Sequence, residues 1–155
     1  MRMRAAYHRR KGTEQFLDFY DVHADCSSGL FRRRKRIVEV SEAFRRLRAC
    51  YARKRLFVIM DNLHNVHDHP RFLAVLRRLH IHPVWTPTDA SWLNAVDDHF
   101  GVTKRATLTG SDDRDNVPRR RRIYRYLRHR NRQVGRADHP LTRIRSTRPI
   151  KLDRH

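Results

Sequence analysis

The sequence lacks a long apolar run and holds only two cysteines. No wholly apolar stretch exceeds the five residues of Leu56–Met60, whereas a helix that spans a bilayer needs about 20. No apolar run follows the basic N-terminus, so a secretory signal is not expected. Cys26 and Cys50 lack the spacing of a disulfide framework or of a metal-binding pair. These absences predict a soluble, cytoplasmic protein in a reducing compartment, with no membrane partner.

Lysine and acidic residues are also scarce beside arginine. Lys+Arg is 36 against 16 for Asp+Glu, which gives a net charge of +20, and only five of the 36 are lysines, so 31 are arginines. The planar guanidinium matches phosphate oxygens, so this excess favours a nucleic-acid partner. A GC-rich genome accounts for part of the arginine content but not for its clustering. A lipid surface is a weaker candidate, because no basic stretch carries a wide apolar face.

At 155 residues the chain has the length of one domain. The spacing of its apolar side chains predicts eight elements. In order they are a strand over Gln15–Val22, a strand from Leu30, a helix carrying Val40, Phe44, Leu47 and Tyr51, a strand over Arg55–Met60, a helix from Pro70 capped by Asp68 or His69, a strand over Pro83–Thr86, a helix capped by Asn94, and a helix over Pro118–Asn131. A hairpin followed by strand–helix alternation predicts an α/β fold, a mixed sheet with helices on its faces. Residues 1–12 are predicted to form a basic arm, 13–134 the domain, and 135–155 a basic extended tail.

Two aspartates are candidates for metal-dependent phosphate chemistry. Asp61 follows a buried strand, where the backbone fixes a side chain at the carboxyl edge of a sheet. Asp97 lies in the first turn of a later helix. Carboxylates are the ligands that Mg²⁺ prefers. Each has a structural alternative: Asp61 can end a strand in an ordinary turn, and Asp97 or Asp98 can complement the helix dipole after an Asn cap.

The residues around these acids form a recognisable pattern. Asp61-Asn62 is followed by Thr86-Pro87-Thr88 and then by Ser91-Trp92-Leu93-Asn94-Ala95-Val96-Asp97, with 35 residues between the two acids. The pattern resembles the catalytic core of bacterial insertion-sequence transposases, in the mariner-related branch of the DDE/D superfamily. Asn62, Ser91, Trp92 and Asn94 support the match, and weaker similarity extends it over about residues 5–135.

The resemblance implies an RNase H-like fold and metal-dependent cleavage and joining of transposon ends. Asp61 takes the place of the family's second catalytic acid and Asp97 that of the third, with Mg²⁺ or Mn²⁺ as cofactor. The implied partners are transposon ends and target DNA, with a homodimer on DNA and association with the nucleoid.

Three departures from the family pattern are visible. Asp97 stands where this branch usually has Glu, and His67 aligns only loosely with a histidine of the family. The family's first strand, which carries the first catalytic acid, has no counterpart after Met1, so the resemblance implies an N-terminally truncated domain lacking that strand. Asp18 and Asp21 on the next strand are poor substitutes, because the register is expected to place them at the wrong end or face of the sheet.

Two arginine-rich runs are candidate DNA contacts. The first holds Arg32, Arg33, Arg34, Lys35 and Arg36, and the second begins with Arg119 and Arg120. Phosphate contact predicts steep salt dependence and little sequence preference, and the alternative is a solvated face. His64, His67 and His69 lie in a predicted loop without a second ligand pair, so we expect them to line the crevice or to be exposed rather than to bind zinc.

The sequence is compatible with three functions. The first is a truncated transposase catalytic domain, whose first acid must come from elsewhere. The second is a non-catalytic basic remnant of a decayed transposase that binds nucleic acid by charge. The third, a small ribosome-associated protein, has no need for the acids at Asp61 and Asp97. The pattern favours the first.

Overall fold

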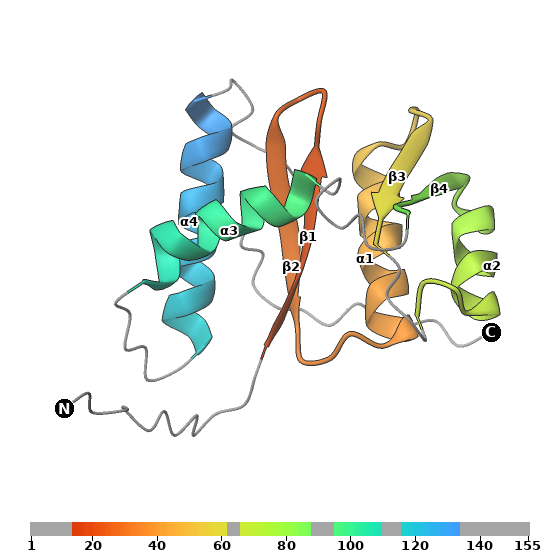
Figure 1. Cartoon of the computed structure of the whole chain (residues 1–155), viewed down its shortest axis with the longest axis horizontal. Helices are drawn as coiled ribbons and strands as arrows, with labels where there is room; N and C mark the ends of the chain where they lie inside the picture. The colour runs from red at the N-terminus through yellow and green to blue at the C-terminus, as the bar shows by residue number, and fades with distance from the viewer. Residues whose placement is uncertain (1–13, 62–65, 88–94, 110–115, 134–155) are drawn as a thin grey trace.

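A computed structural model describes residues 14–61, 66–87, 95–109 and 116–133 (Figure 1). The elements are β1 (Gln15–Asp21), β2 (Cys26–Arg32), α1 (Ile37–Cys50), β3 (Leu56–Met60), α2 (Pro70–Arg78), β4 (Ile81–Trp85), α3 (Ala95–Leu108) and α4 (Asn116–Gln133). The predicted order of strands and helices is confirmed. The predicted arm, the predicted tail and the predicted cap Asn94 lie outside the described residues.

β1 and β2 form an antiparallel hairpin whose register runs from Gln15 opposite Arg32 to Asp21 opposite Cys26. The Asp21 carboxylate shapes the turn by accepting hydrogen bonds from the backbone N–H groups of His23 (3.0 Å) and Ala24 (2.9 Å). Asp25 completes the reversal with φ of 48°, a left-handed conformation that Asp tolerates better than most residues.

Gly29 lies opposite Asp18 in the hairpin, where only hydrogen fits. A Cβ at this position would lie 2.5 Å from Cζ of Phe16 and 2.6 Å from the carbonyl oxygen of Leu17.

We therefore expect Gly29→Ala to lower the free energy of unfolding by about 1–3 kcal/mol through overpacking, measured by urea denaturation. Gly101→Ala is the matched control. On α3 the nearest atom to the new methyl group is Nη1 of Arg105 at 3.6 Å, so this change is expected to stabilise by about 0.5–1 kcal/mol. Similar losses in both variants would contradict the close approach at Gly29.

β3 and β4 form a parallel pair joined by α2, with Leu56 opposite Ile81 and Met60 opposite Trp85. The helix begins as predicted: the His69 imidazole accepts a hydrogen bond from the Arg71 N–H at 3.1 Å, and Pro70 follows the cap. β4 begins two residues earlier than the predicted Pro83. The reason is His80, whose φ of 50° turns the chain directly after α2 and brings the buried Ile81 into the strand.

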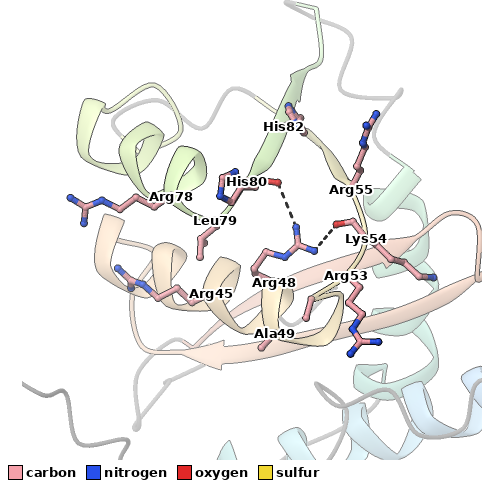
Figure 2. A pocket seen from close by; sticks show the side chains of 11 residues that line it. Arg45, Arg48, Ala49, Arg53, Lys54, Arg55, Arg78, Leu79, His80 and His82 are labelled. Carbon is pink, nitrogen blue, oxygen red and sulfur yellow. Dashed lines mark hydrogen bonds between the residues drawn. The ribbon is translucent and has the colours of Figure 1, made fainter.

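The turn after α1 is organised by one arginine. Arg48 donates hydrogen bonds to the backbone carbonyls of Tyr51, of Lys54 at 2.6 Å and of His80 at 3.5 Å (Figure 2). One guanidinium therefore joins the end of α1 to the start of β3 and to the α2–β4 turn.

α1 packs against both strand pairs. The main core contains Val40, Phe44, Met60, Val66, Phe72, Leu76 and Ile81. Leu17 and Phe19 of β1 and Leu56 and Val58 of β3 pack on this core from the two pairs. α3 and α4 lie beside the hairpin, and α2 lies beside β4 (Figure 1).

The predicted combination of antiparallel and parallel pairing is confirmed, but the strands do not form one continuous sheet. Within the described residues β1 pairs with β2 alone and β3 with β4 alone. On β3, Phe57 is 65% exposed and Ile59 is 50% exposed, so the face away from α1 is open. The hairpin and the parallel pair therefore share a core through α1 without sharing strand hydrogen bonds.

Candidate active site

Asp61 follows β3 directly, at the carboxyl edge of the parallel pair. The N–H of Thr86 donates to the Met60 carbonyl at 3.0 Å, so β3 and β4 end together there. The Asp61 side chain is 56% exposed. Its carboxylate is therefore accessible to solvent at the end of a strand whose backbone is fixed by its neighbour.

His67 holds the backbone of Asp61 in place. Its Nδ1 donates to the Asp61 carbonyl at 2.7 Å and lies 3.8 Å from Asp61 Oδ1. The ring packs against Phe72 (centroids 5.5 Å apart) and Trp85 (6.0 Å) and is only 11% exposed. His67 thus lines the edge as expected, but as a buried support for Asp61 rather than an exposed side chain. His64 lies outside the described residues.

Asp97 lies in the first turn of α3 and is exposed, as is Asp98. Partial burial of its carboxyl raises the pKa of Asp97, the negative charges of Asp61 and Asp98 raise it further, and Lys35 opposes them. The charge of Asp61 thus contributes to the electrostatic environment of Asp97. Asp97 and Asp98 are both exposed in this turn, so either could face Asp61.

A third carboxylate lies near this pair. Side chains alternate along β1, and Phe16 and Tyr20 both face α3: the Phe16 and Phe100 rings are 6.0 Å apart and the Tyr20 and His99 rings 3.8 Å apart. Asp18 lies between Phe16 and Tyr20 on that face. Its Oδ1 is covered and has no hydrogen-bond partner among the described residues.

Asp18 and Asp21 lie on opposite faces of the hairpin, with Asp18 on the face that α3 covers. Burial raises the pKa of Asp18 to about 8; a backbone hydrogen bond from Phe19 and the charge of Arg130 oppose the shift, and the charge of Asp97 adds to it. Asp21 does face away, since its carboxylate accepts from the Tyr51 hydroxyl at 2.8 Å and caps the hairpin turn.

The raised pKa of Asp18 predicts a pH-dependent stability. The folded state holds the proton more tightly than the unfolded chain, whose Asp has the ordinary value of 3.8. This contribution is fully present below that value and is lost as the pH rises through about 8. Asp18→Asn removes the titrating group, so the melting temperature of this variant should rise relative to that of the wild type as the pH rises, by about 2–4 °C per kcal/mol of linkage.

Thermal melts of both proteins between about pH 4 and about pH 9 test this prediction. Asp68→Asn, at an exposed acid just before α2, is the matched control and should keep a constant offset from the wild type. A constant offset for Asp18→Asn as well would show that Asp18 titrates normally in the folded protein.

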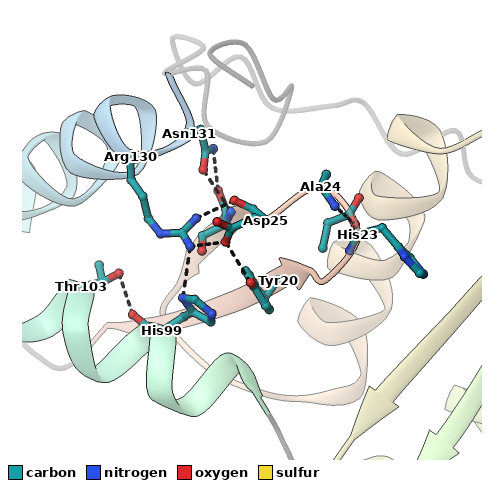
Figure 3. Close-up of polar contacts among 10 residues, drawn as sticks. Tyr20, His23, Ala24, Asp25, His99, Thr103, Arg130 and Asn131 are labelled. Atoms are coloured by element: carbon teal, nitrogen blue, oxygen red, sulfur yellow. Dashed lines mark hydrogen bonds and ion pairs between the residues drawn. The ribbon is translucent and has the colours of Figure 1, made fainter. Parts of the chain in front are cut away.

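A polar network fixes the start of α3 against the hairpin (Figure 3). Arg130 of α4 donates to the Asp25 carbonyl at 2.7 Å, forms an ion pair with the Asp25 carboxylate and contacts His99 Nδ1 at 3.4 Å. Its guanidinium lies 5.7 Å from the centroid of the Tyr20 ring. His99 stacks on that ring two residues after Asp97, so this network sets the position of the helix turn that carries the acid.

Asn131 adds a backbone-like pairing to β2. It is fully buried, accepts from the Ser27 N–H at 3.1 Å and donates to the Ser27 carbonyl at 2.9 Å. A side-chain amide thus replaces a neighbouring strand at this edge. The sequence predicts a helix at Arg130 and Asn131 but no role for them, because the contacts that define them are long-range.

Several of the predicted DNA-binding arginines already have partners. Arg32 pairs with Glu42 at 2.6 Å, Arg36 with Glu39 at 2.5 Å, and Arg120 with Glu14. Arg119 donates to Asn116 at 3.3 Å. Arg33, Arg34 and Lys35 are exposed between the paired residues. Phosphate must compete with a carboxylate at the three paired positions, whereas the exposed residues remain the better candidates.

The described residues do not by themselves form a metal-binding cluster. No three histidine, cysteine or acidic side chains among them converge closely enough to hold an ion together. Asp61 and Asp97 offer oxygen ligands of the type that Mg²⁺ and Mn²⁺ take. Asn62, Ser91, Trp92 and Asn94 of the supporting motif lie outside the described residues. No helix in the described part of the chain is long and apolar enough to cross a membrane.

The fold has a counterpart among solved structures. A chain in "CryoEM structure of simian T-cell lymphotropic virus intasome in complex with PP2A regulatory subunit B56 gamma" is similar with a TM-score of 0.57 and 16% sequence identity. The match covers 74% of this chain and 45% of the other, so this chain spans less than half of that protein's length. The similarity identifies the fold as RNase H-like.

The family is identified from the sequence. The family model described as DDE superfamily endonuclease matches residues 3–117, which include β1 to α3 and both candidate acids. The chain belongs to the DDE superfamily endonuclease family. No curated protein sequence matches it.

Proposed function

We propose that this chain is part of the catalytic domain of a DNA transposase of the bacterial insertion-sequence type, related to the mariner elements. Membership of the DDE superfamily supports DNA cleavage and transfer in general. The observation that carries the proposal is the family match over residues 3–117, which include Asp61 at the end of β3 and Asp97 in the first turn of α3. The influence of the Asp61 charge on the pKa of Asp97 is consistent with it. Transposon ends and target DNA are the proposed substrates, and a homodimer on DNA is the proposed assembly.

The residues around the pair have distinct tasks in this proposal. Asp61 and Asp97 would hold Mg²⁺ or Mn²⁺, and such ions, when bound, lower the pKa of an attacking hydroxyl and stabilise the leaving oxygen. His67 keeps the Asp61 backbone in a fixed position. The contacts of His99 and Arg130 do the same for the first turn of α3. Both supports are buried or half-buried, so the two carboxylates are presented on fixed backbones.

The proposal places the missing first catalytic acid on an extended segment between β1 and β3. The support for this placement is that the two strands face a common core without pairing with each other. Each buried backbone group left without a partner costs about 1–3 kcal/mol, which disfavours a dry gap between two strands. A segment placed there would bring its side chains beside Asp18, on the face that α3 covers. The proposed domain is therefore incomplete without that segment.

A plasmid assay tests the proposed function. Supercoiled DNA is incubated with the chain, alone and with the first catalytic acid supplied by a complementing segment, in the presence of Mg²⁺, Mn²⁺ or EDTA. Nicking that requires both the metal and the complementing segment supports the proposal. Salt-sensitive binding without nicking under any condition would favour the non-catalytic, nucleic-acid-binding alternative.

A further inference from the structure

A second basic surface lies at the opposite end of the parallel pair from Asp61. It is an open hollow of about 570 Å³ between the end of α1, the end of α2 and the amino ends of β3 and β4 (Figure 2). Its charged lining is wholly basic and consists of Arg45, Arg48, Arg53, Lys54, Arg55 and Arg78, with His80 and His82 beside them. None of the residues predicted to bind DNA from the sequence lines it.

The backbone of this region is built to bring the basic side chains together. Arg48 ties the carbonyls of Tyr51, Lys54 and His80 to one guanidinium, so the turn after α1 and the turn after α2 lie side by side. The left-handed φ of His80 reverses the chain after Arg78. Residues far apart in the sequence therefore line one concave surface.

Most of the charges in the hollow are not neutralised by the described residues. Four of the lining arginines are exposed: Arg45, Arg53, Arg55 and Arg78. None of their side chains forms an ion pair or hydrogen bond with a described residue. Some arginines elsewhere in the fold are paired, as Arg32 with Glu42 and Arg130 with Asp25. The hollow therefore keeps its positive charge available for an external anion.

The negative ends of the helix dipoles offset only a small part of this positive charge. α1 and α2 both end at the hollow, and each C-terminus carries about half a negative charge. The two termini thus account for about one of the six cationic side chains. The remaining charges repel one another, and a bound polyanion would relieve that repulsion.

We infer that this hollow, defined by Arg45, Arg53, Lys54, Arg55 and Arg78, binds the phosphate backbone of duplex DNA at a distance from the carboxylate site. Its guanidinium groups match phosphate oxygens, and the rest of its lining consists of Ala49, Ala52, Leu79 and the two histidines. Phosphate contacts carry no sequence information, so the binding should depend little on sequence. The inference extends the proposed function by a second DNA-contacting surface and does not require cleavage.

Binding is measured by fluorescence anisotropy with a labelled duplex of arbitrary sequence, in EDTA and over a series of salt concentrations. The triple variant Arg45→Gln, Arg53→Gln and Arg78→Gln should bind about 10- to 100-fold more weakly near 0.1 M salt, with a salt slope lower by about 2.7. The control Lys104→Gln, Arg105→Gln and Arg125→Gln removes the same charge from exposed positions on α3 and α4. It should lower the slope by less than about one.

A footprint on the unmodified protein provides a second test that does not depend on how the variants fold. Duplex DNA should protect Lys54 in the hollow, but not Lys104 on α3, from an amine-acetylating reagent, as read by mass spectrometry. Equal losses of affinity in the two triple variants, together with equal protection of the two lysines, would mean that DNA binds by net charge alone and would overturn the inference. A different result is that the triple variant of the hollow keeps its affinity for DNA and loses its binding to phosphatidylserine vesicles. That result would assign the hollow to a lipid surface and would also overturn the inference.

The two proposals fail separately. Asp61→Asn should leave the protection of Lys54 intact because Asp61 lies at the other end of β3. Protection of Lys54 without metal-dependent nicking would retain the hollow and remove the proposed function. Metal-dependent nicking with an unprotected Lys54 would retain the proposed function and remove the hollow as a DNA-binding surface.

Discussion

Asp61→Asn is expected to reduce the metal-dependent nicking of supercoiled DNA by about 10²–10³-fold. The amide keeps the shape of the side chain but removes a negative charge from the proposed metal-binding site. Metal ions contribute several kcal/mol of charge stabilisation to phosphoryl transfer, and each 1.36 kcal/mol changes a rate by about tenfold. The rate of nicking in Mn²⁺ by the complemented chain gives the measurement.

Asp68→Asn is the matched control for this variant. Asp68 is exposed and lies close in the sequence, in the turn that leads to α2. The substitution Asp68→Asn removes the same charge without contacting the Asp61 backbone. The rate of nicking should therefore change by less than about threefold, or about 0.65 kcal/mol. Equal rates for the wild type and Asp61→Asn would remove Asp61 from the active site.

Phe72→Ala is expected to lower the free energy of unfolding by about 3–5 kcal/mol, a large part of the 5–15 kcal/mol typical of a domain. Phe72 is fully buried, its ring lies 5.2 Å from that of Phe44 in an edge-to-face contact, and it stacks on His67. The truncation therefore opens a cavity in the core and removes the ring that holds the support of Asp61. Urea denaturation measures the loss.

Val38→Ala provides the comparison on α1, the helix that packs against both strand pairs. Val38 is 68% exposed on α1, so its removal should change stability by no more than about 0.5 kcal/mol. A similar loss in the two variants would mean that the core does not centre on Phe72. Because His67 depends on Phe72, the Phe72→Ala variant should also nick more slowly than the wild type under conditions in which it is folded.

The elements of this fold were predictable because their signals are local. Apolar spacing places the helix that carries Val40, Phe44 and Leu47, and the same residues are buried in the structure. Pro70 and the side chain of His69 define the start of α2 over a few residues. Such features depend on neighbours in the chain, so they can be read without the fold.

The surroundings of the acids could not be predicted in this way. The orientation of Asp18 depends on the packing of α3 over β1, and the roles of Arg130 and Asn131 depend on contacts more than a hundred residues away in the sequence. The basic runs look uniform in the sequence, yet Glu42 and Glu39 pair with two members of the first run and leave the others exposed. The basic hollow could not be predicted for the same reason, because its residues come from two stretches of chain, 45–55 and 78–82.

Iron-directed cleavage of the protein backbone tests the central claim most directly. Fe²⁺ takes carboxylate and imidazole ligands as Mn²⁺ does and binds such sites somewhat more tightly. With ascorbate and peroxide it generates radicals that cut the chain close to the bound ion. The account predicts cuts next to both Asp61 and Asp97, suppressed by excess Mg²⁺ and absent from Asp61→Asn. Cuts beside only one of the two acids, or cuts that Mg²⁺ does not suppress, would contradict a shared metal site.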